Sequence, residues 1–162
     1  MATRGKSEIA INAYLAGIID GEGHISIDRS KTCPQKRRNP RYQAEVTVVN
    51  TDLKLMEFLI ENVGGSFRVR KKIKEWHKET YQWKVASTTA RDLCVRLIPY
   101  LVLKKEQAKC IVQLYEECNF NMRVLNADEL NKRESIYQKL YALTDSRRPQ
   151  RLTEGDLIVY SD

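Results

Sequence analysis

The order of hydrophobic and polar positions predicts a helix and a pair of strands at the start of the chain. Ser7 precedes a stretch with helical spacing, EIAINAYLAGIID, and we expect Gly21 and Gly23 to end this helix. Alternation of apolar and polar residues from His24 to Arg29 is typical of a half-buried strand, and it returns from Tyr42 to Val49. This part of the chain therefore predicts a helix followed by a hairpin.

The same order then repeats. The segment 50–52, Asn-Thr-Asp, has the composition of a helix N-terminus, and Gly64-Gly65 is a natural end for the helix that follows it. Alternation predicts a strand over 66–74 and a partner strand over 81–86. A second helix and a second hairpin are the result.

Three helical patterns complete the predicted domain. They cover 89–97, 104–118 and about 126–143, and Asn126 with Glu129 resembles an N-cap and its N3 partner. Residues 1–145 are expected to form one domain, and 146–162, which lack a clear period, a C-terminal tail. The predicted class is α+β, an antiparallel sheet covered by helices on one face.

Alternation along the strands divides their side chains between two faces of the sheet. The apolar face, which we expect to meet the helices, comprises Ile25, Ile27, Ala44, Val46, Val48, Phe67, Val69, Trp83 and Val85. The other face holds hydrogen-bonding and basic groups, namely Ser26, Asp28, Gln43, Glu45, Thr47, Arg68, Arg70, Lys72, Gln82 and Lys84. An ordinary solvent-facing sheet also has this composition.

Charge favours a nucleic-acid partner for that polar face. Lys and Arg outnumber Asp and Glu by 28 to 21, the net charge is +7 and the pI is about 9.3. Five of the seven residues in RVRKKIK are basic, and the loop 29–41 carries basic residues and no acids. A two-stranded ribbon fits the DNA major groove, where Arg reads guanine, Gln reads adenine and Glu reads cytosine. We therefore expect these residues to bind double-stranded DNA.

The cysteines and the hydropathy exclude other classes of protein. The four cysteines include no C-x-x-C pair, which argues against a structural zinc site. No segment has the pattern of a signal peptide or the length of a membrane span. We expect an intracellular protein with reduced thiols and no membrane partner.

Two segments resemble a known family. LAGIIDGEG, from Leu15 to Gly23, resembles the LAGLIDADG motif of homing endonucleases, and PYLVLKKEQA, from Pro99 to Ala108, resembles the segment that carries the active-site lysine in homodimeric members encoded in chloroplast ribosomal RNA introns. The resemblance implies an αββαββα core with a saddle-shaped antiparallel sheet and extra C-terminal helices. It also places Lys104 in the position of that lysine.

The resemblance implies that the first helix pairs with its copy in a homodimer. Ala10, Ala13 and Gly17 share one helical face, with Ala16 beside them, and small residues let two helix backbones approach closely. One motif per chain requires a second copy, so a two-fold dimer is expected. The expected interface residues are Ala13, Ala16, Gly17 and Asp20. Asp20 is expected to have a structural role, capping the partner helix or its own turn.

Catalytic roles follow from the same resemblance. Glu22 is expected just beyond the helix, where its carboxylate and the Gly21 carbonyl suit Mg²⁺. Mn²⁺ is expected to substitute, and Ca²⁺ to support binding without cleavage. Lys104 is expected to stabilise charge on the phosphate. Asp52 lies where related homodimers carry a polar residue that organises active-site water.

The implied function is a site-specific double-strand DNA endonuclease, intron-encoded, that binds a long pseudo-palindromic site and leaves 3′ overhangs. An RNA-binding maturase with intron RNA as its partner, and a non-cleaving DNA-binding regulator, are alternatives on the same fold. The implied location is an organelle, chloroplast or mitochondrion, or the prokaryotic cytoplasm.

Overall fold

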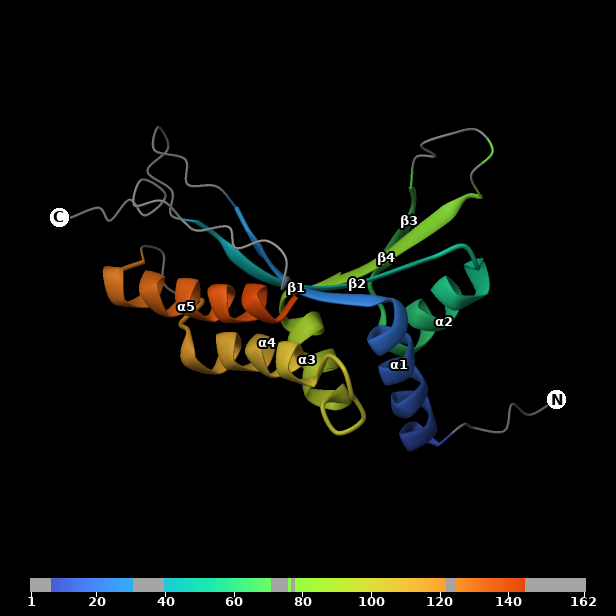
Figure 1. Ribbon diagram of the computed structural model, residues 1–162, viewed down its shortest axis with the longest axis horizontal. Helices are drawn as coiled ribbons and strands as arrows, with labels where there is room; N and C mark the ends of the chain where they lie inside the picture. Colours follow the sequence, from blue (N-terminus) through green and yellow to red (C-terminus); the bar gives the residue numbers. More distant parts are fainter. Residues whose placement is uncertain (1–6, 31–39, 71–75, 77, 122–124, 145–162) are drawn as a thin grey trace.

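A computed structural model describes residues 7–30, 40–70, 76, 78–121 and 125–144. Helices and strands follow in the predicted order (Figure 1). They are α1 Glu8–Glu22, β1 Gly23–Arg29, β2 Tyr42–Asn50, α2 Leu53–Val63, β3 Ser66–Arg70, β4 Thr80–Ala86, α3 Ser87–Leu97, α4 Lys105–Glu117 and α5 Ala127–Thr144. The α+β prediction is confirmed, and the predicted tail, 146–162, lies outside the described residues.

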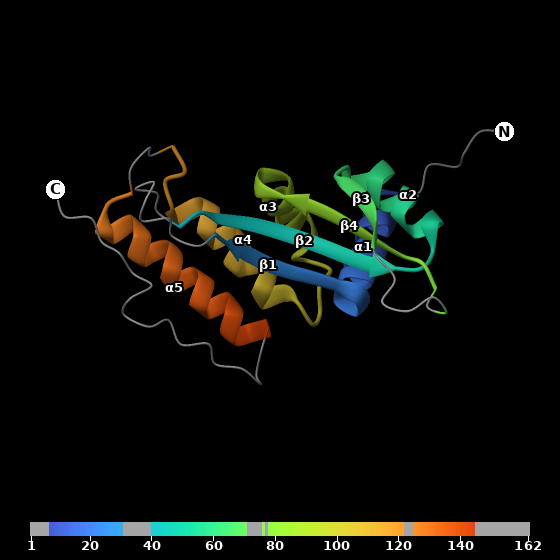
Figure 2. The same ribbon diagram turned by 90° about the horizontal axis from the view of Figure 1, so that it is seen from above.

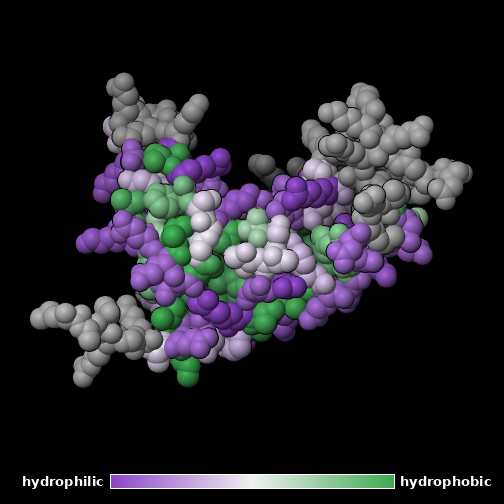
Figure 3. All heavy atoms as spheres, turned by 180° about the vertical axis from the view of Figure 1, so that it is seen from behind, coloured by the Kyte–Doolittle hydropathy of each residue, from purple (hydrophilic) through white to green (hydrophobic). Residues whose placement is uncertain are grey.

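The strands form one antiparallel sheet in the order β1-β2-β4-β3. Its two ends rise away from the helices, so the sheet is a saddle with the described helices on its lower side (Figure 1). Seen from above, the strands cross the molecule between α5 at one edge and α1 and α2 near the other end (Figure 2). The hollow of the saddle carries many hydrophilic side chains (Figure 3).

The register aligns the apolar face across the central strands. Ile25 pairs with Val46, and Val46 pairs with Val85, so one row of β-branched side chains faces the helices. These residues are buried, together with Trp83, whose indole Nε1 donates to the Gly64 carbonyl at 2.9 Å. None of the described helices is long and apolar enough to cross a membrane.

The predicted burial of β3 is wrong. Phe67 is 39% exposed and Val69 54% exposed, although both share the apolar face of the sheet. The reason is tertiary: β3 is one of the two edge strands, and it rises with the end of β4 beyond the area that the helices cover (Figure 1). Phe67 contacts the ring of Tyr81 edge-on, at 6.0 Å between centroids.

The end of α1 also differs from the prediction. The helix continues through Gly21, and Glu22 is its last residue rather than the first residue after it. The chain then enters β1 at Gly23 without a loop. A β-carbon at Gly23 would lie 2.7 Å from the backbone of Ile19, so only glycine permits this helix-to-strand junction.

Helix α5 is attached to the first hairpin through a buried carboxylate. Glu134 accepts from Arg29 of β1 at 3.2 Å, from the Tyr42 hydroxyl of β2 and from Gln138 at 2.7 Å. Burial and the neighbouring Glu134 carboxylate raise the pKa of Tyr42. These contacts hold the far end of the saddle against the helical layer.

Candidate functional site

The C-terminal end of α1 is tied to the turn that precedes α4. The Asp20 carboxylate accepts from the backbone N–H of Val102 at 2.7 Å and of Lys104 at 2.9 Å. In return, Lys104 Nζ donates to the carbonyls of Ile19 at 2.7 Å and Asp20 at 2.6 Å. The lysine therefore sits at the negative end of the helix dipole, next to Gly21 and Glu22.

Asp20 caps a turn of its own chain, and its place at the dimer interface stays a prediction. Both carboxylate oxygens are engaged by the 102–104 turn of its own chain. Its alternative, structural role applies, because the short side chain caps a turn that would otherwise leave its backbone donors without protein partners. The capped turn is what presents Lys104.

Lys104 is partly buried, and desolvation lowers its pKa although the Asp20 carboxylate opposes the shift. Two carbonyls accept from its ammonium group, which leaves one of its three donors for another acceptor. The lysine is thus a positioned cation at the end of α1.

Glu22 is held from the neighbouring strand. Its carboxylate accepts from the side-chain amide of Asn50, the last residue of β2. The Asn50 side-chain oxygen in turn accepts from the backbone N–H of Asp52 at 2.8 Å. Glu22 and Gly21 remain exposed, so the carboxylate is oriented and accessible.

Asp52 is the N-cap of α2, and its carboxylate accepts from Lys54 N at 2.9 Å. The polar residue that contacts Glu22 is Asn50, for which the sequence predicts only a place at the start of a helix. The strand pattern does carry a sign of this contact. Asn50 follows Val46 and Val48 at the period of the buried face, and a polar residue in that register needs a polar partner below the sheet.

The outer face of α1 lines a hollow of about 490 Å³. Ala13 and Gly17 are exposed there, and a β-carbon added at Gly17 would meet no atom within 4 Å. The hollow is lined by Ala13, Tyr14, Gly17, Ile18, Gly21, Glu22, Asn50 and Leu55. The active-site candidates Glu22 and Asn50 therefore lie on the same surface as the small residues of the motif helix.

Ala16 differs from the other small residues of α1, and its place at the dimer interface stays a prediction. Only 1% of Ala16 is exposed, and it packs in the core of its own chain. One residue along a helix turns the side chain by about 100°, which places Ala16 on the inner face while Gly17 stays outside. The accessible small residues are Ala13 and Gly17, with Ala10 above them.

The polar face of the sheet assembles as the alternation predicts. The register pairs Ser26 with Glu45, Asp28 with Gln43, Thr47 with Lys84, and Arg68 with Gln82. Arg70 continues the row on β3, and Lys72 lies outside the described residues. These side chains share the side of the sheet opposite the helices, and their contact with DNA stays a prediction.

Neighbouring side chains on this face already interact. Lys84 forms an ion pair with Glu45, and Arg68 donates to Gln82 Oε1 at 3.3 Å. Gln43 donates to the hydroxyl of Ser87 at 2.7 Å. Ser87 opens α3 with a φ of 55°, an uncommon value for a residue other than glycine.

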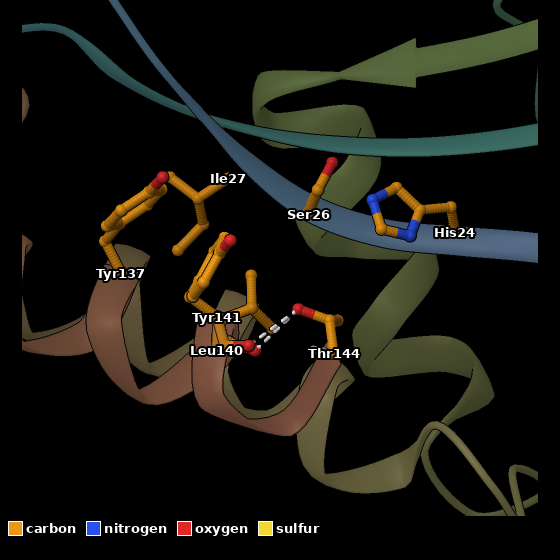
Figure 4. Close-up of a pocket in the computed structure, with 7 residues that line it drawn as sticks. All are labelled: His24, Ser26, Ile27, Tyr137, Leu140, Tyr141 and Thr144. Carbon is orange, nitrogen blue, oxygen red and sulfur yellow. Dashed lines mark hydrogen bonds between the residues drawn. The ribbon is translucent and has the colours of Figure 1, made fainter. Parts of the chain in front are cut away.

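A second hollow, of about 370 Å³, lies where the outer edge of β1 faces the last turns of α5 (Figure 4). His24 and Ser26 border it from the strand, and Tyr137, Tyr141 and Thr144 from the helix. The Thr144 hydroxyl donates to the carbonyls of Leu140 and Tyr141, so it is occupied within α5. Aromatic rings and hydroxyl groups contribute to the lining of this hollow, and none of its lining residues carries a carboxylate.

Among the described residues, no group of three or more His, Cys, Asp or Glu side chains is placed to hold a metal ion. A single chain offers one exposed carboxylate at the end of α1. Any metal bound there would need further ligands from outside this chain.

Comparison with known proteins identifies the fold. Residues 15–108 match the family model of the LAGLIDADG endonucleases. No curated protein sequence matches. Among the solved structures with similar folds are three complexes, one with its target and two with DNA. The homing endonuclease I-CvuI with its target has a TM-score of 0.72 at 22% identity, covering 90% of this chain and 88% of that one. The archaeal intron-encoded homing endonuclease I-Vdi141I, complexed with DNA, has a TM-score of 0.69 at 16% identity, covering 90% of this chain and 91% of that one.

The third is I-CeuI, a homing endonuclease encoded by a group I intron, with a TM-score of 0.59 and 20% identity over 96% of this chain and 73% of that one. The family match spans both the motif helix and the Lys104 segment, more than half of the chain. The chain therefore belongs to the LAGLIDADG endonuclease family.

Proposed function

We propose that this protein is a site-specific double-strand DNA endonuclease that works as a homodimer with Mg²⁺. The observation that carries the proposal is the assembly of Glu22, Asn50 and Lys104 around the end of α1. Three distant segments of the chain supply an oriented carboxylate, an amide and a positioned ammonium group.

The saddle is proposed to bind DNA in its hollow. A strand of seven residues spans roughly 23 Å, and B-DNA advances about 3.4 Å per base pair along each strand, so one half-saddle tracks roughly seven base pairs. Family relatives with this fold were crystallised on DNA, which supports the same mode here. Two copies of the chain would then cover a long pseudo-palindromic site.

The homodimer is supported by the outer face of α1. Exposed Ala13 and Gly17 leave room for a second helix backbone, and the hollow beside them is open. The turn before α4, which Asp20 caps, lies on the side of α1 away from α2 (Figure 1), and its residues Val102 and Leu103 are exposed and apolar. A two-fold axis along α1 brings that flank of one copy against the α2 flank of the other.

The residues at the end of α1 fit a hard cation. Glu22 and the Gly21 carbonyl offer oxygen ligands, with no sulfur or imidazole in the hollow that they line, as Mg²⁺ prefers. Phosphate oxygens and the Glu22 of the second copy would complete the set. When bound, the metal supplies activation of water and stabilisation of charge on the leaving oxygen. Mn²⁺ is expected to substitute, and the I-CvuI complexes, crystallised in the presence of Ca or Mg, support divalent metal use.

The remaining steps belong to side chains of the chain itself. Asn50 keeps the Glu22 carboxylate aimed into the hollow, and the backbone N–H of Asp52 keeps the Asn50 side chain in place. Lys104 uses two donors to fix the end of α1 and offers its charge to the scissile phosphate, where negative charge develops. Hydrolysis of one phosphodiester in each strand, across the minor groove, would leave 3′ overhangs.

A cleavage selection tests the proposal. Purified protein is incubated with a library of duplexes that carry randomised palindromic half-sites, once with Mg²⁺ and once with Ca²⁺, and bound and cut molecules are sequenced. The expected result is cutting of one palindromic family with Mg²⁺ and binding alone with Ca²⁺. Selective binding without cutting in Mg²⁺ would instead indicate a DNA-binding regulator. Binding of intron RNA with no duplex selected would indicate a maturase.

A further inference from the structure

An ion pair stands in the middle of the sheet face. Lys84 extends from β4 to Glu45 on β2, the neighbouring strand. The Glu45 side chain is only 15% exposed and that of Lys84 45% exposed. The residues directly across from Glu45 are small, Ser26 on one side and Ala86 on the other. The pair is therefore isolated from other charged side chains of its cross-strand neighbours.

Stability alone does not account for an acid at this position. An ion pair at the protein surface contributes about 0–1 kcal/mol to folding. The paired apolar residues on the opposite face of the sheet already hold β2 between β1 and β4. On a face that binds a polyanion, a carboxylate is repelled by phosphates unless it is neutralised or bonded to a base. Because β2 is hydrogen-bonded on both sides, its backbone cannot move Glu45 away from DNA.

The hydrogen-bond donors of Lys84 and the acceptors of Glu45 match the groups that one G·C base pair presents in the major groove. In the major groove, guanine presents two neighbouring acceptors, N7 and O6, and cytosine presents the N4 amino donor beside them. An ammonium group has three donors and a carboxylate has spare acceptor sites. After one donor of Lys84 is used on Glu45, two remain for the guanine. Glu45 still has capacity to accept from the cytosine.

We propose that Glu45 and Lys84 act as one unit that reads a single G·C base pair in each half-site, an inference that rests on the proposed function. Lys84 donates to guanine O6 and N7, and Glu45 accepts from cytosine N4, with the ion pair intact. An A·T pair fits less well. Its two acceptors, adenine N7 and thymine O4, are separated by the N6 donor, and the thymine methyl group crowds O4.

The test is a specificity profile on the duplex chosen by the cleavage selection. Affinity is measured in Ca²⁺ for the wild type on every single base-pair change of the half-site. One position is expected to favour G·C by about 5- to 150-fold, the range of a good bidentate base contact. The variants Glu45→Gln and Lys84→Met should each flatten the preference at that position and leave the other positions unchanged.

The double variant and a matched control sharpen the result. If the residues act as a unit, Glu45→Gln with Lys84→Met loses no more discrimination at that position than either single change. Arg68→Gln, which alters the neighbouring Arg68–Gln82 pair, should change the preference at a different base pair. Urea unfolding of each variant checks that it is folded.

Two outcomes would overturn the inference while the endonuclease stands. In one, the variants weaken binding equally for every sequence, as loss of a phosphate contact does. In the other, the position that they alter favours A·T in the wild type. A wild type that selects no duplex at all would instead contradict the proposed function itself.

Discussion

At the scale of single residues, the site depends on short polar side chains that fix one another. Asn50 joins Glu22 to the start of α2, while Asp20 and Lys104 exchange hydrogen bonds between the end of α1 and the turn before α4. Glu22 is thereby oriented by contacts that do not use the substrate. Such pre-organisation lowers the cost of arranging the site during the reaction.

Glu22→Gln is expected to abolish cleavage and leave DNA affinity within about threefold, because the amide keeps the size of the side chain and loses only the charge that suits a hard cation. Binding is measured by titration in Ca²⁺ and cleavage in Mg²⁺ on the selected duplex. Glu57→Gln, an exposed change on α2, is the control. A Glu22→Gln protein that cuts at the wild-type rate would remove this carboxylate from the mechanism.

Asn50→Ala should slow single-turnover cleavage by about 10- to 100-fold, because a misaligned catalytic group costs that much without any loss of binding. DNA affinity should stay unchanged. Thr51→Ala, at the exposed neighbouring position, serves as the control for the loop. Restoration of the rate by Asn50→Gln, whose longer amide can still donate, would support positioning. Equal rates for Asn50→Ala and the wild type would contradict it.

The pH dependence of cleavage should report Lys104. Burial lowers the pKa of its ammonium group, so this lysine loses its proton at a lower pH than an ordinary lysine near 10.5. The positive charge is complete below the lowered value and is lost as pH rises through it. Single-turnover rates should therefore fall on the alkaline side before pH 10.5. If the cleavage rate of Lys104→Arg falls at the same pH as that of the wild type, another group is responsible for the alkaline loss of activity.

At the scale of elements, the structure explains how each end of the saddle is supported. The β1–β2 end rests on α5 through Glu134, Arg29 and Tyr42. Among the described helices, α2 and α3 contact β4, but β3 is exposed along its whole length, Ser66–Arg70. We expect the first hairpin to be held firmly and the second to depend on its own pairing and on Trp83.

Glu134→Ala should destabilise the fold by about 2–4 kcal/mol, because it leaves the buried partners of the carboxylate without their acceptor. Urea unfolding measures the change. Hydrogen exchange should also rise in β1 and α5 more than in α2. Glu116→Ala removes an exposed acid from α4 and should be close to neutral. A loss below about 0.5 kcal/mol for Glu134→Ala would show that α5 docks by apolar contact alone.

At the scale of the whole molecule, the proposed two-fold pairing can be separated from the stability of the chain. Within one chain, Gly17 has free space around it and stands in the interior of a helix. Replacing it should therefore not harm the fold. In a dimer with closely packed α1 helices, the same replacement would push the helices apart.

Gly17→Leu is expected to keep or raise the stability of the monomer, by up to about 1 kcal/mol from helix propensity, and to abolish the dimer. Sedimentation measures the assembly and urea unfolding the stability. Gly17→Ala should keep more of the dimer, and Glu116→Leu on the exposed face of α4 should keep all of it. If Gly17→Leu still forms a dimer, the dimer interface does not lie on the Gly17 face of α1.

The periodicity of the sequence determined the element order and the polar face of the sheet, because both follow from local backbone geometry and from burying one face of each element. Two segments that resemble the family, 15–23 and 99–108, identified Glu22 and Lys104 as site candidates. Only the tertiary structure decided the contacts between segments. It buried Ala16, joined Asp20 to the 102–104 turn, left Phe67 and Val69 exposed, and brought Asn50 to Glu22. These outcomes depend on which surfaces meet across the fold, and sequence spacing along one element carries no information about the partner on another.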